Sequence, residues 1–245
     1  LLFKEKHKLL IIKEIYMKNI KKIIVSFGLI ISFNGFAEVL EIYTWKANEG
    51  ELDKMLEGFM EAKAIHESEG SVVVSIEQTD IGATGEYQYT MRWDNLLQWG
   101  EYKDMIASSE NWQKFWTKWS KNPSAQLVAT VSGGSLDTSK AEDYRDLYVW
   151  SAYEWRPAPG RTAEMLQRMA TSKSIIEKTG AKVTIYSEGA GGTGDYHFVM
   201  FYDTWTDMAK SFQNLSTNQE WQSFNASNDP TVSTLISTTS GQKIN

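Results

Sequence analysis

The chain has 245 residues, of which 42% are hydrophobic and 23% charged, proportions typical of a folded globular domain, and it contains no cysteine. Disulfides, thiolate metal sites and cysteine nucleophiles are therefore excluded. Residues 1–37 hold seven lysines and two glutamates of the chain's 25 basic and 31 acidic side chains, which leaves 18 basic and 29 acidic from residue 38 onwards. Nucleic acids and anionic membranes attract basic surfaces, so this acidic balance argues against both as partners.

Residues 17–37 have the pattern of a secretory signal peptide. A basic segment at residues 17–22 precedes an apolar stretch at residues 23–33, and small residues precede a cleavage position after Ala37. The apolar stretch is shorter than the about 20 residues that a membrane-spanning helix needs. We therefore expect an exported protein, periplasmic or secreted, that is free of the membrane after cleavage. Residues 1–16 precede this signal, and we expect them to be a mis-assigned upstream extension rather than part of the fold.

The sequence after the predicted signal repeats itself. Segments 50–70 and 160–180 align at an offset of 110 residues. Segments 85–94 and 194–203 align at an offset of 109, as do segments 112–115 and 221–224. Agreement over so long a register indicates a tandem duplication. We assign the first copy to residues 38–131 and the second to residues 147–245. Residues 132–146, rich in glycine, serine and charge, form the predicted linker between them.

Hydrophobic periodicity predicts the same order of elements in both copies. In the first copy we expect a strand at 40–46, a helix from Leu52 that ends at Gly70, strands at 72–74 and 85–94, a helix at 95–119 and a strand at 127–131. In the second we expect a strand at 147–153, a helix that ends at Gly180, strands at 183–185 and 194–203, a helix at 206–227 and a strand at 232–237. A β-α-β-β-α-β unit of about 100 residues is the ferredoxin-like motif. The fold class is thus α+β, with two antiparallel sheets that cover each other face to face.

The second copy carries a further local pattern. Residues 153–156 (YEWR) and the later Pro159-Gly160 are similar to the strand-one tyrosine, arginine and Pro-Gly turn of NIPSNAP-like units. In the first copy, Asn48-Glu49-Gly50 stands in place of that turn. In topology, nearly all of residues 38–245 resembles the dimeric α/β-barrel superfamily, which includes the antibiotic-biosynthesis-monooxygenase, NIPSNAP and chlorite-dismutase-like families. The resemblance implies that the two copies form a pseudo-dimeric α/β barrel.

Side chains of successive strand residues point to opposite faces of a sheet, which divides the third strands into two faces. The aromatic-rich face, which we expect to pack under the helices, consists of Tyr87, Tyr89, Met91 and Trp93 in one copy and Tyr196, Phe198, Met200 and Tyr202 in the other. The opposite face carries Gln88, Arg92, His197 and Phe201. The resemblance implies that this second face looks into the barrel, where the superfamily commonly holds ligands. We therefore expect these four residues to bind a small molecule between the copies.

His197 and Arg92 are the candidate catalytic residues on this inner face. An imidazole can act as a general base, a haem ligand or a hydrogen-bond donor; the alternative is a buried histidine satisfied by a neighbour, or one at a solvated rim. Arg92 would suit a carboxylate or enolate ligand, and its alternative is an ion pair with an acidic side chain across the sheet. Trp45 and Trp150, near the ends of the first strands, are further candidates for lining a ligand pocket.

Four other residues of the first copy have either a structural or a ligand-binding role as their alternatives. His66, near the end of the first helix, is expected to be solvated or to interact with the helix dipole. Trp112, Trp116 and Trp119 fall at helical spacing, which favours core or inter-copy packing and leaves ligand stacking as the alternative. No sequence motif for a metal site occurs, so we expect no resident metal.

The sequence leaves three functions open. The first is an exported protein that binds a small molecule between its copies without turnover. The second, implied by the resemblance, is a cofactor-independent monooxygenase or related enzyme in which His197 and Arg92 polarise the substrate. The third is haem binding through His197, since tandem units in this superfamily can use the second copy for haem; the first two functions need no cofactor. Whether the chain is an enzyme and whether it forms a homo-oligomer both stay open.

Overall fold

The structure is a computed structural model that describes residues 38–83 and 85–244. The predicted upstream extension at 1–16 and signal peptide at 17–37 lie outside the described residues. Within the described ranges, no helix is both long enough and apolar enough to cross a bilayer.

The helices and strands follow the predicted β-α-β-β-α-β order in each copy. In the first copy they are β1 (Val39–Ala47), α2 (Leu52–Glu69), β2 (Val73–Ile81), β3 (Glu86–Trp93), α3 (Leu96–Ser108), α4 (Glu110–Ser120) and β4 (Ala125–Ser135). Between the copies lies the short helix η1 (Ala141–Tyr144). In the second copy they are β5 (Val149–Pro157), α5 (Thr162–Ile176), η2 (Glu177–Thr179), β6 (Lys182–Glu188), β7 (Tyr196–Tyr202), α6 (Trp205–Thr217), α7 (Gln219–Ala226) and β8 (Ser233–Lys243).

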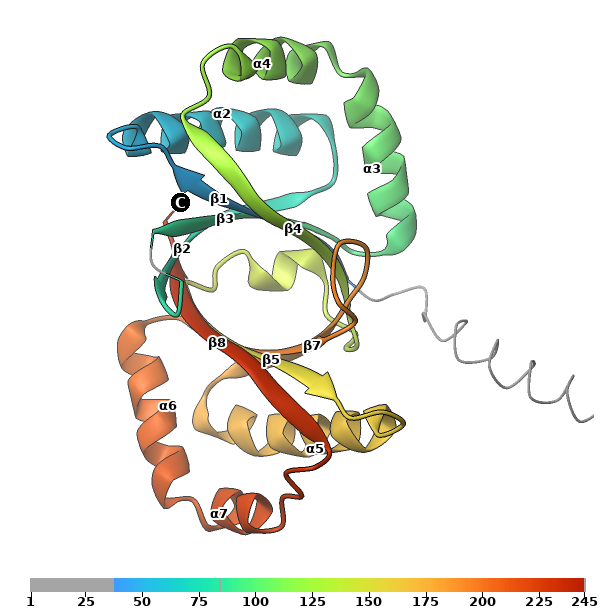
Figure 1. Cartoon of the computed structure of the whole chain (residues 1–245), viewed down its shortest axis with the longest axis vertical. Helices are drawn as coiled ribbons and strands as arrows, with labels where there is room; N and C mark the ends of the chain where they lie inside the picture. The colour runs from blue at the N-terminus through green and yellow to red at the C-terminus, as the bar shows by residue number, and fades with distance from the viewer. Residues whose placement is uncertain (1–37, 84, 245) are drawn as a thin grey trace, which may run out of the picture. The chain divides into compact units, whose positions relative to one another are not determined.

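The second helix of each copy is divided in two, although the sequence predicted continuous helices at 95–119 and 206–227. At Ser109 the backbone is extended, with a ψ of 121°. Its side chain accepts a hydrogen bond of 3.0 Å from the backbone N–H of Trp112 and so begins α4 as an N-cap. Asn218 begins α7 in the same way. The chain therefore changes direction at each cap (Figure 1).

In the described part of the chain, the strands form one closed antiparallel barrel in the order β1-β3-β2-β8-β5-β7-β6-β4. Each copy contributes four neighbouring strands, β4-β1-β3-β2 and β8-β5-β7-β6. The two predicted sheets are joined edge to edge, because β2 pairs with β8 and β4 pairs with β6. The predicted α+β class and barrel are therefore found, but the strands make a single closed sheet rather than two facing ones.

The copies join because the last strand of each is longer than predicted. β4 continues beyond the predicted end at Val131 to Ser135, and residues 133–135 pair with β6. β8 continues to Lys243 in the same way and pairs with β2 there. These extensions close the barrel at both junctions between the copies.

Glycine permits the close approach of strands at both junctions. A Cβ atom on Gly241 would lie 2.2 Å from the backbone oxygen of Gln78. A Cβ atom on Gly133, the equivalent position of the first copy, would lie 2.9 Å from the backbone oxygen of Ser187. Any side chain at these positions would thus force neighbouring strands apart.

The helices cover the outside of the barrel, with α2, α3 and α4 over the first copy and α5, α6 and α7 over the second (Figure 1). The aromatic-rich face of the third strands packs under them, which confirms that prediction. Trp93 is fully buried, and its ring lies 5.2 Å from the ring of Tyr102 in α3. Met55 of α2 and its counterpart Met165 of α5 are buried in the same two cores. Burying each such side chain stabilises the fold by about 1.5–3 kcal/mol.

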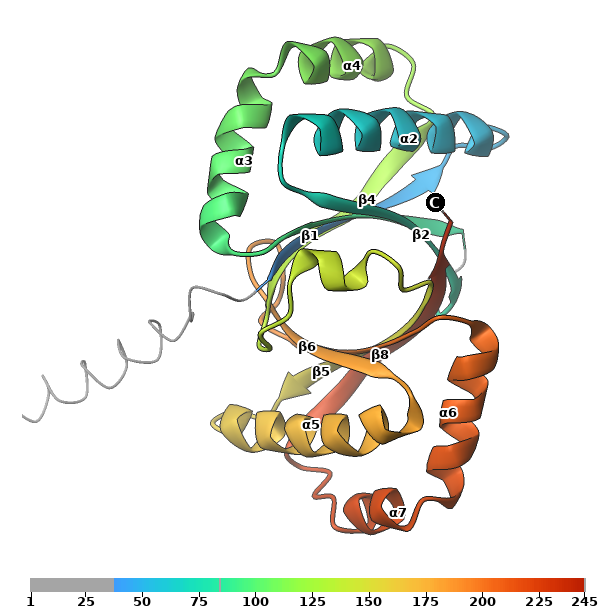
Figure 2. The ribbon, with the colours of Figure 1, turned by 180° about the vertical axis from the view of Figure 1, so that it is seen from behind.

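The chain between the copies runs through the inside of the barrel. Part of the predicted linker at 132–146, the helix η1 (Ala141–Tyr144), lies within the ring of strands when seen from both sides (Figures 1 and 2). Its first backbone N–H donates to the carboxylate of Asp94 at 3.0 Å. Its last residue, Tyr144, has its hydroxyl 2.6 Å from the hydroxyl of Thr184. The linker is thus anchored to both copies.

Little space remains inside the barrel around this linker. The cavity bounded there by Arg92, Tyr144, Trp150 and Phe201 is about 10 Å³, enough for about one water molecule. Sites for drug-sized ligands begin at roughly 300 Å³. The part of the barrel interior beside Arg92 and Trp150 is therefore occupied by the linker, a role that its polar composition did not indicate.

Candidate functional site

Arg92 lies on the inner face of the barrel, as predicted, and it is 6% exposed. Its Nη1 donates to the carboxylate of Glu38 at 2.5 Å and to the hydroxyl of Tyr186 at 3.0 Å. The guanidinium carbon lies 4.6 Å from the centre of the Tyr144 ring. Burial raises the pKa of the Glu38 carboxyl, while Arg92 acts in the opposite direction. The arrangement is the ion-pair alternative, in which the charge of Arg92 is matched by a carboxylate of the protein itself.

His197 lies on β7 beside the glycine-rich loop that joins β6 to β7. Its Nε2 is 2.9 Å from one carboxylate oxygen of Glu188. The other oxygen accepts hydrogen bonds from the backbone N–H groups of Thr193, Gly194 and Asp195. Burial acts to raise the pKa of Glu188, but the hydrogen bonds from His197 and from the loop outweigh it and lower the pKa. His197 is therefore satisfied by a neighbour.

The other predicted site residues are divided between the two faces of the barrel wall. Gln88 is half-buried and pairs in register with Thr44. Phe201 and Trp150 are buried beside Tyr144 of the linker. Trp45 lies on the helix-covered face instead, where it lines a large cavity. The structure thus does not bring the six predicted residues together into one site.

The histidine environments do not fit a haem held by His197. The Nε2 of His197 is engaged by Glu188, and the cavity beside Arg92 and Tyr144 is about 10 Å³. His66, the other histidine in the described ranges, has its Nδ1 hydrogen-bonded to Tyr102 and its ring centre 4.4 Å from that of Trp112. The cavity beside His66 is about 260 Å³, below the size at which sites for drug-sized ligands begin. Neither of these two histidines is therefore placed to ligate a haem iron.

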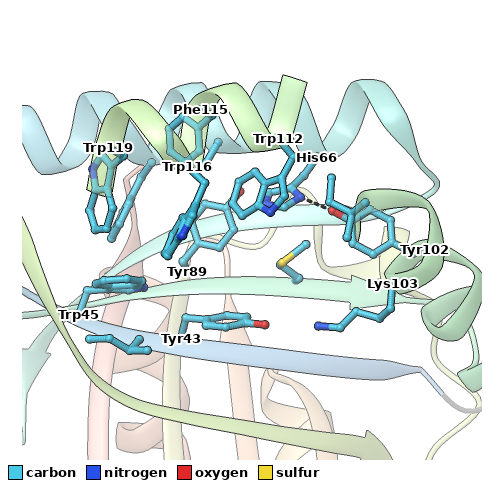
Figure 3. Close-up of a pocket in the computed structure, with 15 residues that line it drawn as sticks. Tyr43, Trp45, His66, Tyr89, Tyr102, Lys103, Trp112, Phe115, Trp116 and Trp119 are labelled. Atoms are coloured by element: carbon cyan, nitrogen blue, oxygen red, sulfur yellow. Dashed lines mark hydrogen bonds between the residues drawn. The ribbon is translucent and has the colours of Figure 1, made fainter. Parts of the chain in front are cut away.

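That cavity, which we call the first-copy cavity, lies between the sheet and the helices of the first copy (Figure 3). Most of its wall is aromatic and is made by Tyr43, Trp45, Phe59, Tyr89, Trp112, Phe115, Trp116 and Trp119. Trp116 and Leu127 are about half exposed, at 47% and 48%, so the cavity reaches the surface beside them. The tryptophans of α4 are therefore placed both to pack on the core and to stack on a ligand.

His66 is buried in the wall of this cavity, so the expectation of a solvated histidine was wrong. It is 5% exposed, and its Nδ1 shares a hydrogen bond with the hydroxyl of Tyr102 (Figure 3). Burial lowers the pKa of His66 to about 4, so the imidazole is neutral at pH 7. The sequence held a signal for this position, because Met55, Phe59 and His66 lie at helical spacing on one buried face of α2.

A second polar group meets the opposite side of the first-copy cavity. The carboxylate of Glu41 on β1 accepts from the Nζ of Lys103 at 2.9 and 3.0 Å, from the hydroxyl of Tyr43 at 2.7 Å, and from the indole N–H of Trp99 at 2.8 Å. Burial and the Glu41 charge raise the pKa of Tyr43, which stays protonated. Figure 3 shows the Tyr43 hydroxyl and the Lys103 ammonium pointing toward each other across the cavity floor. An ammonium has three N–H donors, so Lys103 retains a donor beyond its bonds to Glu41.

Two buried polar atoms of the cavity wall have no hydrogen-bond partner within the described structure. They are the hydroxyl of Tyr89 and the indole N–H of Trp119. Burial raises the pKa of Tyr89 well above its ordinary value, so its hydroxyl remains a donor. A buried polar group left unpaired costs about 1–3 kcal/mol.

The second copy has an equivalent cavity of about 490 Å³, which we call the second-copy cavity. It lies between its sheet and α5, α6 and α7, and it differs from the first in its polar groups. The counterparts of Glu41, His66, Tyr102 and Lys103 are Ser151, Ile176, Ser211 and Phe212. The duplicated fold therefore carries acid–base side chains in one of two equivalent places.

Comparison with known proteins identifies the fold but not a family. No known family model matches the sequence, and no curated protein matches it. Among solved structures, a candidate monooxygenase from Fusobacterium nucleatum is similar with a TM-score of 0.54 and 8% identity, over 85% of this chain and 92% of that one. An anthrone oxidase-like protein has a TM-score of 0.55 and 11% identity, over 87% and 93%. A mutant chlorite dismutase from Candidatus Nitrospira defluvii has a TM-score of 0.51 and 9% identity, over 85% and 92%.

These similarities agree with the predicted α/β-barrel fold. At such low identity they establish the fold alone, and function must be argued from the site. The narrower NIPSNAP likeness, which rested on residues 153–156 and Pro159-Gly160, stays a prediction.

Proposed function

We propose that this chain binds a small aromatic molecule in the first-copy cavity. The observation that carries the proposal is the difference between the copies: the buried His66–Tyr102 pair and Lys103, which is paired with Glu41, border this cavity, and their counterparts in the other copy carry no ionisable group. Polar groups retained at one of two equivalent apolar sites point to a ligand at that site. The predicted signal peptide would place this binding in the periplasm or outside the cell.

The cavity supports a planar aromatic ligand with an oxygen substituent. Its volume is about 260 Å³. An apolar cavity of about 150 Å³ is already large enough to hold benzene. The rings of Trp112 and Trp116 offer faces for stacking. The Lys103 ammonium offers a donor to a phenolic or carbonyl oxygen.

Calorimetric titration with 2-naphthol tests this proposal, using the same substitution at two equivalent positions. Trp112→Ala removes a wall of the first-copy cavity, and we expect it to weaken binding about tenfold, since an aromatic pair contributes roughly 1 kcal/mol and its removal also exposes the cavity. Trp221→Ala removes the equivalent ring of the second copy and should change the affinity less than twofold. Equal losses from the two variants would contradict the proposal.

A second candidate function is oxygen-dependent oxidation of such a ligand without a cofactor. The specific observation is the Lys103 ammonium at the cavity floor, which keeps one N–H donor beyond its two bonds to Glu41 and could hold the negative oxygen of an enolate or phenolate. Such an anion is electron-rich enough to reduce dioxygen. With anthrone, one oxygen atom would become the new ketone of anthraquinone, and the other would leave as water with the two methylene hydrogens. The anthrone oxidase-like and candidate monooxygenase neighbours make this reaction worth testing.

Oxygen uptake with anthrone distinguishes binding from turnover. If the second candidate is right, anthraquinone forms with one molecule of oxygen consumed for each, and Lys103→Met slows the rate by about tenfold or more, because the anion loses its charged partner. Binding of 2-naphthol without oxygen uptake above the uncatalysed rate would leave the chain as a binding protein and remove the oxidase function.

A further inference from the structure

The second-copy cavity is a separate compartment with its own chemistry. Its volume of about 490 Å³ is roughly three times that of an apolar cavity that binds benzene. The inner wall is apolar and buried, with Met165, Met169, Phe198 and Met200 among its residues. Methionine side chains are flexible and adapt to differently shaped apolar ligands. The inner end of this cavity is thus suited to a hydrocarbon group.

The outer end of the same cavity is polar. Arg168, Asn225 and Asn228 line it together with Ser216 and Ser233. Asn225 and Asn228 are exposed, whereas Arg168 is only 25% exposed. A cavity with a buried apolar end and a polar, cationic mouth matches a molecule with one apolar part and one polar head.

The cationic mouth arises from a paired difference between the copies. In the first copy, Gly58 packs against Trp119, and a Cβ atom at that glycine would lie 2.9 Å from the indole nitrogen. In the second copy, Arg168 stands at the position of Gly58 and Asn228 at the position of Trp119. Arg168 Nη1 donates a hydrogen bond to the side-chain oxygen of Asn228. Loss of the large ring makes room for the guanidinium, so the two changes depend on each other.

The charge of Arg168 is only partly matched within the protein. Glu164 lies 3.6 Å from its Nη2, beyond hydrogen-bond distance. The same Glu164 carboxylate accepts hydrogen bonds of 2.7 and 3.0 Å from Arg161. A guanidinium has five N–H donors in a planar fork that matches a carboxylate. Arg168 therefore keeps donors for an anionic group at the mouth.

We infer that the second-copy cavity binds an amphiphilic carboxylate, with the carboxylate on Arg168 and the hydrocarbon part among the methionines of the inner wall. This inference does not depend on the function proposed for the first-copy cavity, because the two cavities share no lining residue.

Calorimetric titration of the full chain with decanoate and with 1-decanol tests the inference. Both probes have the same hydrocarbon chain, but only decanoate offers a carboxylate. Arg168→Gly, which installs the residue of the first copy, should weaken decanoate binding about tenfold or more, as expected for a hydrogen bond to a charged group. It should change 1-decanol binding less than twofold. Arg145→Gly removes the same charge from a site outside both cavities and should leave both affinities unchanged.

A second variant fills the mouth of the second-copy cavity instead of only removing its charge. The double substitution Arg168→Gly with Asn228→Trp recreates the Gly58–Trp119 pair of the first copy, and we expect it to reduce the binding of both probes. All of these variants should still bind 2-naphthol. A result that overturns the inference about the second-copy cavity is therefore distinct from one that overturns the function proposed for the first-copy cavity. No binding of decanoate to the unmodified chain, or equal affinity in Arg168→Gly, would overturn the inference.

Discussion

Replacement of Arg92 by leucine is expected to lower the free energy of unfolding by about 3–5 kcal/mol, the cost of leaving one partner of a buried ion pair alone. Glu38 is fully buried and accepts from Arg92 at 2.5 Å. Without the guanidinium, the Glu38 carboxylate must stay charged in an apolar barrel or take up a proton. Urea denaturation at pH 7, followed by circular dichroism, measures the change.

Two further variants separate this cause from a general loss of packing. The double substitution Arg92→Leu with Glu38→Leu removes both charges, so it should recover part of the stability lost in the single variant. Arg145→Leu breaks an ion pair with Glu142 that is mostly exposed and should cost less than about 1 kcal/mol. A loss below about 1 kcal/mol in Arg92→Leu would contradict the account of the barrel interior.

The second large effect is a loss of stability in acid caused by His66. Its pKa is about 4 in the folded chain, well below the ordinary histidine value of about 6.5, so the unfolded chain binds more protons between these two pH values. Folding is therefore favoured as pH rises through this window. The stabilisation is fully present above about pH 6.5 and is lost as pH falls to about 4. The pKa difference corresponds to about 3 kcal/mol.

Burial is the main cause of this low pKa, and nearby charges have smaller and opposing effects. Glu69 and Glu41 act to raise it, whereas Lys103 acts to lower it. Urea denaturation at pH 4, 5, 6 and 7 should show a shallower pH dependence in His66→Ile, which carries the residue of the second copy. Met60→Ile, at an exposed position of the same helix, changes no titrating group and should keep the slope of the unmodified chain. An unchanged slope in His66→Ile would refute the burial of a neutral His66.

The duplication and the element order could be predicted from the sequence, because they depend on local periodicity and self-similarity. Alternation along β3 and β7 correctly separated the helix-covered face from the inner face that holds Arg92. The junctions of the barrel could not be predicted in this way. Gly133 and Gly241 resemble linker residues in sequence, and only the neighbouring strands explain them: a Cβ atom at these positions would lie 2.9 and 2.2 Å, respectively, from a backbone oxygen.

The candidate site was harder to predict because its members are distant in sequence. His66 meets Tyr102 across 36 residues, and Glu41 meets Lys103 across 62. Helical spacing along α2 could have placed His66 on the buried face, but it could not have supplied its partner. The linker composition likewise gave no sign that Tyr144 would occupy the barrel interior, where the ligand was expected.

The central claim is that the first-copy cavity is the site of an aromatic ligand. A crystal structure of the chain with 6-bromo-2-naphthol, measured at the bromine absorption edge, tests it most directly. We expect an anomalous bromine peak enclosed by the rings of Trp45, Trp112 and Trp116, with the naphthol oxygen within hydrogen-bond distance of Lys103. A bromine peak in the second-copy cavity or inside the barrel, with none in the first-copy cavity, would contradict the claim.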